Sequence, residues 1–185
     1  MSDKRIEKTV QLIENAFFDL YNICPLEKIS ITKICDKANI NRSTFYYHYV
    51  DYPSFLAHME ESIIEDYMNI NNQYQYDTDT HKILDDTISY LCDNRDKARF
   101  LFRNGHNSEG VNRIKQLLQE KSMPIWLRES NMTAAEFELV FTYFINGAFA
   151  LLEYYFKHPV LEKNHVLEIM DEVIKYGVYS FVYTK

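Results

Sequence analysis

The stretch from Ser30 to Tyr49 reads SITKICDKANINRSTFYYHY, and its pattern decides the fold. Its first half spaces apolar residues along one face of a helix, at Ile31, Ile34, Cys35 and Ala38. Ser30 precedes this run and carries the kind of hydroxyl that caps helix starts. The helix breaks at residues 38–41, where Asn39 tolerates the left-handed backbone that a tight turn needs.

A second short helix follows the turn. Asn41 has the right chemistry to cap it, and it runs through Tyr49. Phe45 and Tyr49 are four residues apart, so we expect them to point inward together with Ile40. The remaining surface is polar, aromatic and cationic, formed by Arg42, Ser43, Thr44, Tyr46, Tyr47 and His48. Two short helices with such a second helix are typical of a helix-turn-helix.

These residues resemble the DNA-binding domain of TetR-family transcriptional regulators over about residues 5–60. The matching positions, in order, are Ile31, Ile34, Ala38-Asn39-Ile40, the run from Arg42 to Tyr49, and Asp51. The run is most similar to the branch that includes regulators of dihydroxyacetone kinase genes. Two positions depart from the family. Its members commonly have Gly where Asn39 stands, and a Lys near Tyr52 that touches a DNA phosphate, so here the Tyr52 hydroxyl would have to serve.

The resemblance implies a set of DNA contacts at these positions: Thr32, Lys33, Asn41, Arg42, Ser43, Thr44, Tyr46, Tyr47, His48 and Tyr52. Arg42 has the fork that binds guanine or lies along a phosphate, and the Tyr46 ring suits a thymine methyl. Thr32 and Lys33 would contact the DNA backbone at a helix start, where free N–H groups favour an anion. The alternative interpretation is an ordinary amphipathic helix with a solvated face.

Composition favours long helices. Hydrophobic residues make up 46% of the 185 residues, and only 4 Gly and 4 Pro interrupt them, so we predict an all-α chain. The net charge of −7 is unevenly distributed. Residues 1–50 hold seven Lys and Arg against six Asp and Glu (+1), and the other 135 residues hold 13 against 21 (−8). A locally basic N-terminal part on an acidic body is compatible with DNA binding.

The resemblance implies two domains, a helix-turn-helix over 1–50 and a helical effector-binding and dimerisation domain over 51–185. Asp51 can cap a linking helix over 51–73, with Pro53 in its first turn. Thr133 and Glu136 form a capping box that opens a long helix. The other helices are expected at 4–23, 81–92, 95–103, 108–121, a short piece near Trp126 after an interruption at Pro124, 134–158 and 161–182.

The helix expected over 134–158 is apolar over more than one face, so it must be covered on several sides, and the last helix adds further apolar residues. Together the two helices resemble the helix pair through which the family forms a four-helix dimer interface. The expected interface residues are Phe144, Gly147, Ala148, Leu151, Tyr155, Ile169, Val173 and Tyr176. The alternative is a large core within one chain. A homodimer would let two recognition helices engage an inverted repeat.

The middle of the body is rich in large rings, and in the family such helices enclose a pocket for a small molecule. The candidate effector residues are Tyr90, Phe100, Phe102, Trp126, Phe141 and Phe144. Aromatic spacing of this kind also fits a plain core, and some members of the named branch act through a partner protein instead. Both alternatives stay open.

Enzymatic and metal chemistry find little support. There is no phosphate-binding glycine loop, no nucleophile elbow and no HExxH motif. The three cysteines form no CxxC pair and the six histidines are scattered, so we expect neither metal nor cofactor. No apolar run of about 18 residues predicts a membrane span, and no signal core follows the N-terminus, so we expect a cytoplasmic protein.

The sequence therefore predicts a TetR-type regulator, more often a repressor than an activator in this family, that binds a palindromic operator as a dimer. A small-molecule effector or a partner protein would control it. Two alternatives stay open. One is a protein-interaction module or co-activator of the same fold with weak or partner-dependent DNA binding, and the other is a small-molecule binding protein.

Overall fold

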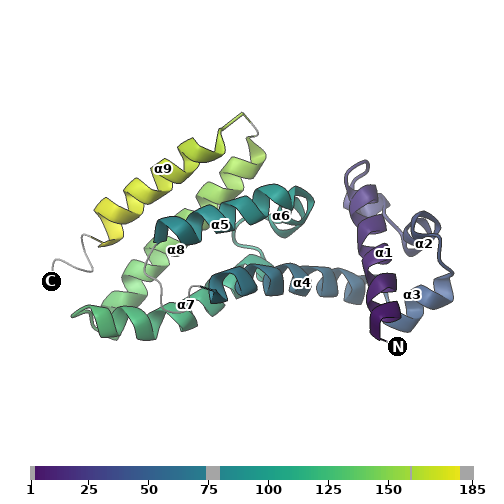
Figure 1. The fold of residues 1–185 in the computed structure, drawn as a ribbon, viewed down its shortest axis with the longest axis horizontal. Coiled ribbons are helices and arrows are strands. Elements are labelled where there is room, and N and C mark those ends of the chain that lie inside the picture. The colour runs from purple at the N-terminus through teal and green to yellow at the C-terminus, as the bar shows by residue number, and fades with distance from the viewer. Residues whose placement is uncertain (1–2, 74–79, 159, 180–185) are drawn as a thin grey trace. The chain divides into compact units, whose positions relative to one another are not determined.

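The computed structural model describes residues 3–73, 80–158 and 160–179, and every regular element in these ranges is helical (Figure 1). The predicted all-α fold is confirmed. The chain forms two compact units, residues 1–63 and 64–185, which we call the N-terminal and the C-terminal unit. The division falls inside one helix. The functional boundary after residue 50 stays a prediction.

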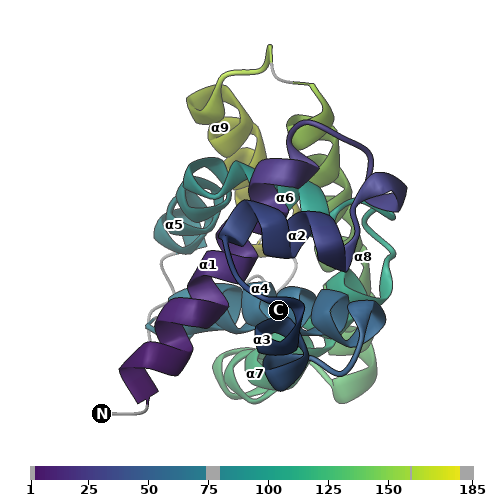
Figure 2. The same ribbon diagram turned by 90° about the vertical axis from the view of Figure 1, so that its right-hand side faces the viewer.

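The N-terminal unit is built from α-helices (Figure 2), and aromatic side chains cluster in its core. Its elements are α1 (Asp3–Tyr21), the 3-10 turn η1 (Leu26–Lys28), α2 (Ile31–Ala38), α3 (Arg42–His48) and the first part of α4 (Tyr52–Asn72). Phe17 of α1, Phe45 of α3 and Phe55 of α4 are fully buried. The Phe55 ring centroid lies 5.3 Å from that of Phe17 and 5.5 Å from that of Phe45. This contact fixes α3 against the other helices.

The turn between α2 and α3 has the predicted geometry. Asn39 adopts the left-handed conformation, with φ 53° and ψ 49°. The Ile40 N–H donates to the Cys35 carbonyl at 3.0 Å and the Asn39 N–H to the Asp36 carbonyl at 3.3 Å, which is the Schellman pattern. At the other end of α2, the Ser30 hydroxyl accepts from the Lys33 N–H at 3.4 Å, so the predicted cap is confirmed.

Asn41 precedes α3, but its side chain makes no capping hydrogen bond, so the expected side-chain cap is wrong. The Asn41 carbonyl instead accepts the first helical bonds, from the Thr44 N–H at 2.9 Å and the Phe45 N–H at 3.3 Å. The start of α4 behaves as predicted. The Asp51 carboxylate accepts from the Ser54 N–H at 2.8 Å, and the Ser54 hydroxyl accepts from the Asp51 N–H at 3.0 Å.

The C-terminal unit contains the second part of α4 and five further α-helices. These are α5 (Thr80–Asp93), α6 (Arg95–Leu101), α7 (Glu109–Glu129), α8 (Ala134–Lys157) and α9 (Lys163–Val173), and α9 continues into the π-helical segment η2 (Ile174–Tyr179). α5 packs against α9 and α7 against α8 (Figure 1). The predicted capping box is present: the Thr133 hydroxyl accepts from the Glu136 N–H at 3.2 Å, and Glu136 accepts from the Thr133 N–H at 2.9 Å.

Two helix predictions in this unit are wrong. Pro124 does not interrupt the chain, because α7 runs from Glu109 to Glu129 with Pro124 inside it and Trp126 on the same helix. Proline removes one hydrogen bond from the ladder, and the bonds of the flanking turns keep the helix continuous here. The last α-helix ends at Val173 rather than continuing to residue 182, and the π-helical turn follows it. Residues 180–182 lie outside the described part.

Replacing Asn39 by Ala is expected to lower the free energy of unfolding by about 1 kcal/mol, because a Cβ-bearing residue without a local polar group is strained at positive φ. Asn39→Gly is the matched control and should retain the wild-type stability. Chemical denaturation followed by circular dichroism measures both. An Ala variant as stable as the wild type would show that this turn carries no conformational strain.

Candidate functional site

The recognition surface is formed by the outward side of α3, and we define it as Arg42, Ser43, Tyr46 and Tyr47. All four are exposed, with Tyr46 at 48% and Tyr47 at 75%. Thr44 and His48 are half-buried at its edge. The short helix therefore brings six of the predicted DNA contacts together, because burial of Phe45 turns the remaining side chains outward.

The other predicted contacts lie at the start of α2 and before α3. Thr32, Lys33 and Asn41 are exposed. The Lys33 ammonium donates to the Lys28 carbonyl at 2.8 Å, which ties its side chain to the preceding turn. Lys37, also on α2, forms an ion pair with Asp19 of α1 at 3.0 Å. The cations of α2 thus already have partners within the N-terminal unit.

Tyr52 is not arranged as predicted. Its hydroxyl is buried and has no hydrogen-bond partner among the described residues. Its ring stacks on Phe55 with centroids 6.2 Å apart, and burial raises the pKa of Tyr52 to about 12. The expected phosphate contact through this hydroxyl is therefore wrong for this conformation.

The hydrogen bonds of Ser54 to the nearby Asp51 hold the pKa of the Asp51 carboxyl below its usual range. The start of α4 is therefore capped by a carboxylate anion.

A hollow of about 300 Å³ lies within the N-terminal unit beside the end of α3. It is lined by Val10, His48, Tyr49, Val50, Ser54 and His58. Sequence reasoning missed His58, whose Nε2 lies 3.6 Å from Oε1 of Glu14 on α1. The Tyr49 hydroxyl is buried without a partner in the described part of the chain, and its burial raises the pKa of Tyr49 well above the usual range.

A solved structure has the same arrangement of helices. It is a TetR transcriptional regulator from Streptococcus agalactiae 2603V, with a TM-score of 0.62 and 18% sequence identity over 91% of this chain and 96% of that one. The chain has a TetR-type fold. No protein-family model and no curated protein sequence matches it.

In this TetR-type fold, the C-terminal unit exposes large apolar side chains on α8 and α9. The outer stripe of α8, as we name it, consists of Leu139, Tyr143, Gly147, Ala150 and Tyr154. Leu139 is 75% and Tyr143 77% exposed. Three residues of the predicted interface, Ile169 and Val173 on α9 and Tyr176 after it, are also exposed. Sequence reasoning missed Leu139, Tyr143 and Tyr154, because a helix that is apolar all round does not indicate which side the chain itself covers.

Apart from Gly147 of the outer stripe, the other predicted interface residues are less exposed. Phe144, Ala148 and Leu151 line a groove of about 250 Å³ between α8 and the last helical segments, together with Tyr143, Gly147, Met170, Val173 and Ile174. Tyr155 points into the unit. It is 6% exposed, and its hydroxyl lies 3.3 Å from the sulfur of Cys92. We therefore leave Tyr155 out of the interface.

The predicted effector residues do not form one group. Trp126 packs against Phe141 and Phe144, with ring centroids 6.1 and 6.4 Å apart. Phe102 packs instead against Phe149 at 6.3 Å. The Tyr90 hydroxyl donates to Asp66 at 3.0 Å, and the Arg103 guanidinium lies 4.0 Å from the centre of the Phe100 ring. The rings are distributed over separate packing clusters, and their role in binding a ligand stays a prediction.

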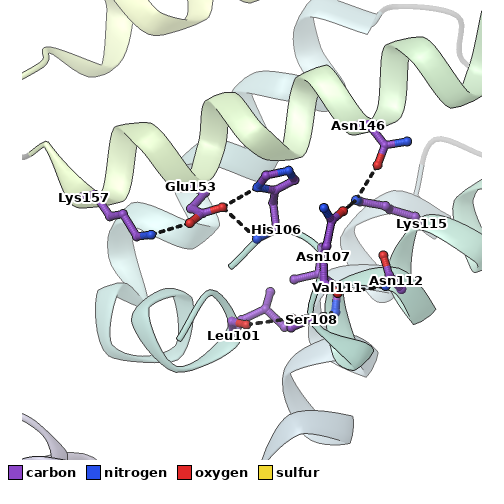
Figure 3. Close-up of polar contacts among 10 residues, drawn as sticks. All are labelled: Leu101, His106, Asn107, Ser108, Val111, Asn112, Lys115, Asn146, Glu153 and Lys157. Carbon is purple, nitrogen blue, oxygen red and sulfur yellow. Dashed lines mark hydrogen bonds and ion pairs between the residues drawn. The ribbon is translucent and has the colours of Figure 1, made fainter. Parts of the chain in front are cut away.

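A polar cluster joins the turn before α7 to α8 (Figure 3). The Glu153 carboxylate accepts from the His106 backbone N–H at 2.7 Å, lies 2.5 Å from His106 Nδ1 and pairs with Lys157. Lys115, 7% exposed, donates to Asn107 at 3.1 Å and to Asn146 at 2.8 Å. Burial lowers the pKa of Lys115. In the described ranges, no three histidine, cysteine or acidic residues gather as a metal site.

Glu153 should stabilise the C-terminal unit in a pH-dependent way. Hydrogen bonds from Lys157 and His106 lower the pKa of Glu153 from 4.5 to about 2. Because the folded-state pKa is lowered, this contribution is complete above pH 4.5 and is lost as pH falls toward 2. Glu153→Gln is expected to reduce the free energy of unfolding by about 1–3 kcal/mol at pH 7 and by roughly half as much near pH 3, which lies between the two pKa values.

Urea denaturation at pH 7 and pH 3 measures this difference. Glu138→Gln is the matched control, since Glu138 is an exposed carboxylate on the same helix. An equal loss for Glu153→Gln at both pH values would mean that the charge of Glu153 does not stabilise the fold.

Proposed function

We propose that this chain is a TetR-type transcriptional regulator that binds an inverted-repeat operator through α3. The observation that supports this proposal is the recognition surface on α3, within a TetR-type fold. The Schellman turn before α3 and the buried Phe45 fix the orientation of this short helix, so that the recognition surface faces outward. Exposed arginine, serine and tyrosine side chains on such a helix are suited to contacts with base edges and phosphates in the major groove.

The proposed regulator acts as a homodimer through α8 and α9. Gly147 and Gly177 support this assignment, because a Cβ built on either would meet nothing within 4 Å in the chain. A glycine inside a helix costs about 0.5–1 kcal/mol relative to alanine, and packing within one chain does not require it here. A second helix that approaches the outer stripe closely would require it. The same contact would cover Leu139 and Tyr143.

Dimerisation also accounts for the apolar character of α8. Of the described helices, α8 alone is long and apolar enough to cross a membrane, a property that core helices of soluble proteins share. One of its sides is buried within the chain, through residues such as Phe137, Phe141 and Phe149. A partner chain on the outer stripe would cover the other side, which fits the proposed cytoplasmic regulator.

The proposal has three further parts. A small-molecule effector or a partner protein controls the regulator, the regulator represses its target genes, and it is related to regulators of dihydroxyacetone kinase genes. Each rests on the family resemblance of the sequence. An effector would act by binding more tightly to the dimer conformation that has low affinity for the operator.

A second candidate is a protein-interaction module or co-activator of this fold. The charge of the N-terminal unit favours it: residues 1–63 contain seven Lys and Arg and nine Asp and Glu, a net charge of −2. A unit with a net negative charge is not attracted to DNA over long distances. Partner-dependent DNA binding would compensate for the missing attraction.

Selection from a random duplex library with the purified full chain is expected to enrich an inverted repeat. Arg42→Ala should weaken binding to the enriched site by about 1–3 kcal/mol if Arg42 contacts a base, because it is exposed and makes no ion pair with a described residue. Lys28→Ala, which removes an exposed cation outside α2 and α3, is the matched control for charge. Enrichment of no sequence by the folded protein would favour the interaction module.

Tyr143→Glu is expected to convert the homodimer into a folded monomer, because it places a charge in the centre of the outer stripe while Tyr143 is 77% exposed in the single chain. Sedimentation equilibrium should give twice the chain mass of 22.1 kDa for the wild type and the chain mass for the variant. Thr142→Glu, an exposed neighbour outside the stripe, should stay dimeric. A dimeric Tyr143→Glu variant would move the interface to another surface.

A further inference from the structure

The recognition surface carries little free positive charge. Arg42 is the one lysine or arginine on α3, and it makes no ion pair in the described part of the chain. Of the two lysines on α2, Lys37 is paired with Asp19, and the Lys33 ammonium is bound to the Lys28 carbonyl. The whole N-terminal unit has a net charge of −2. Neutralisation of phosphates, which usually dominates protein–DNA affinity, is therefore small here.

The recognition surface carries two exposed aromatic rings beside its one free cation, Arg42, in the described part of the chain. Tyr46 and Tyr47 are 48% and 75% exposed. The Tyr46 ring packs edge-on against Phe45, with centroids 5.9 Å apart, and the Tyr47 ring stands perpendicular to His48 at 5.1 Å. Both phenol hydroxyls lack a partner among the described residues. These ring contacts support the two side chains and leave apolar ring surface open to solvent.

The major groove contains one apolar group that can bury such rings, the C5-methyl of thymine. Adenine, guanine and cytosine present only hydrogen-bond donors and acceptors there, and these leave a phenol ring without an apolar contact. Two neighbouring rings on one short helix therefore select for thymines within a half-site. The phenol hydroxyls can at the same time donate to a phosphate or a base acceptor.

We infer that Tyr46 and Tyr47 determine operator specificity by burying their rings against thymine methyl groups, so that the operator half-sites contain thymine opposite α3 and binding depends weakly on salt. This inference rests on the proposed function, because it names the class of DNA that the proposed regulator recognises. It also assigns the ring of Tyr47, the more exposed of the two, a part in base recognition.

The test replaces thymine by deoxyuridine in the operator obtained by selection, since this change removes only the methyl group. Binding by the full-length wild type is measured by fluorescence anisotropy. We expect about a fourfold loss of affinity for each contacted methyl, the value of one buried carbon. Deoxyuridine placed outside the half-sites is the control and should have no effect.

Protein variants show which ring is responsible. Tyr47→Ala should weaken binding to the thymine operator and become insensitive to deoxyuridine at the contacted position, whereas Tyr47→Phe should keep the sensitivity because it keeps the ring. Tyr46→Ala and Tyr46→Phe apply the same comparison to the neighbouring position. All four variants change an exposed side chain, and thermal melting verifies that each variant folds.

The salt dependence gives an independent readout. Even if Lys33 exchanges the Lys28 carbonyl for a phosphate and Arg42 meets one as well, the dimer neutralises about four charges, and log Kobs falls with log salt with a slope no steeper than roughly −4. Full sensitivity of Tyr47→Ala to deoxyuridine, loss of sensitivity in Tyr47→Phe, or a slope steeper than about −7 would overturn the inference while DNA binding stands. Failure of the wild type to enrich any DNA would overturn the proposed function, and this inference with it.

Discussion

The contacts of the Phe55 ring with Phe17 and with Phe45 are the constraint on which the N-terminal unit depends. α3 has only seven residues, too few to be stable as an isolated helix. Full burial of Phe45 against the Phe55 ring of α4, which itself packs on Phe17 of α1, holds this helix in one rotation about its axis. The exposed residues of α3 have a defined orientation only because Phe45, on the same helix, is fully buried.

The C-terminal unit depends instead on the apolar faces of α8. α8 is apolar on more sides than one chain can cover, so one side packs inward through Phe137, Phe141 and Phe149 and the outer stripe remains exposed. Polar groups appear where the turn before α7 meets this helix, and there Glu153 binds both the backbone and the side chain of His106. A carboxylate with 13% of its side chain exposed thus organises a turn that contains a glycine at positive φ.

Local chemistry made much of this fold predictable from sequence. Ser30, Asn39 and Thr133 each act through neighbouring backbone groups, and their roles follow from residue type and spacing. Pro124 could not be assigned in this way, since only the surrounding turns decide whether a helix survives one missing hydrogen bond. The Tyr52 hydroxyl is buried because its ring packs against Phe55, and this packing could not be predicted from the sequence pattern either. For α3 the exposed face was predictable, and what it binds stays a prediction.

α4 links the two compact units without a break, and the division between them falls between Ile63 and Ile64, both of which are buried. A chain cut at this point would leave the carbonyls of the last helical turn before the cut without their hydrogen-bond donors. Most modular proteins join their parts through polar linkers that tolerate cutting and exchange. Here the chain passes from one unit to the other within a single helix, so recombination between related genes would have to preserve the hydrogen-bond ladder of α4.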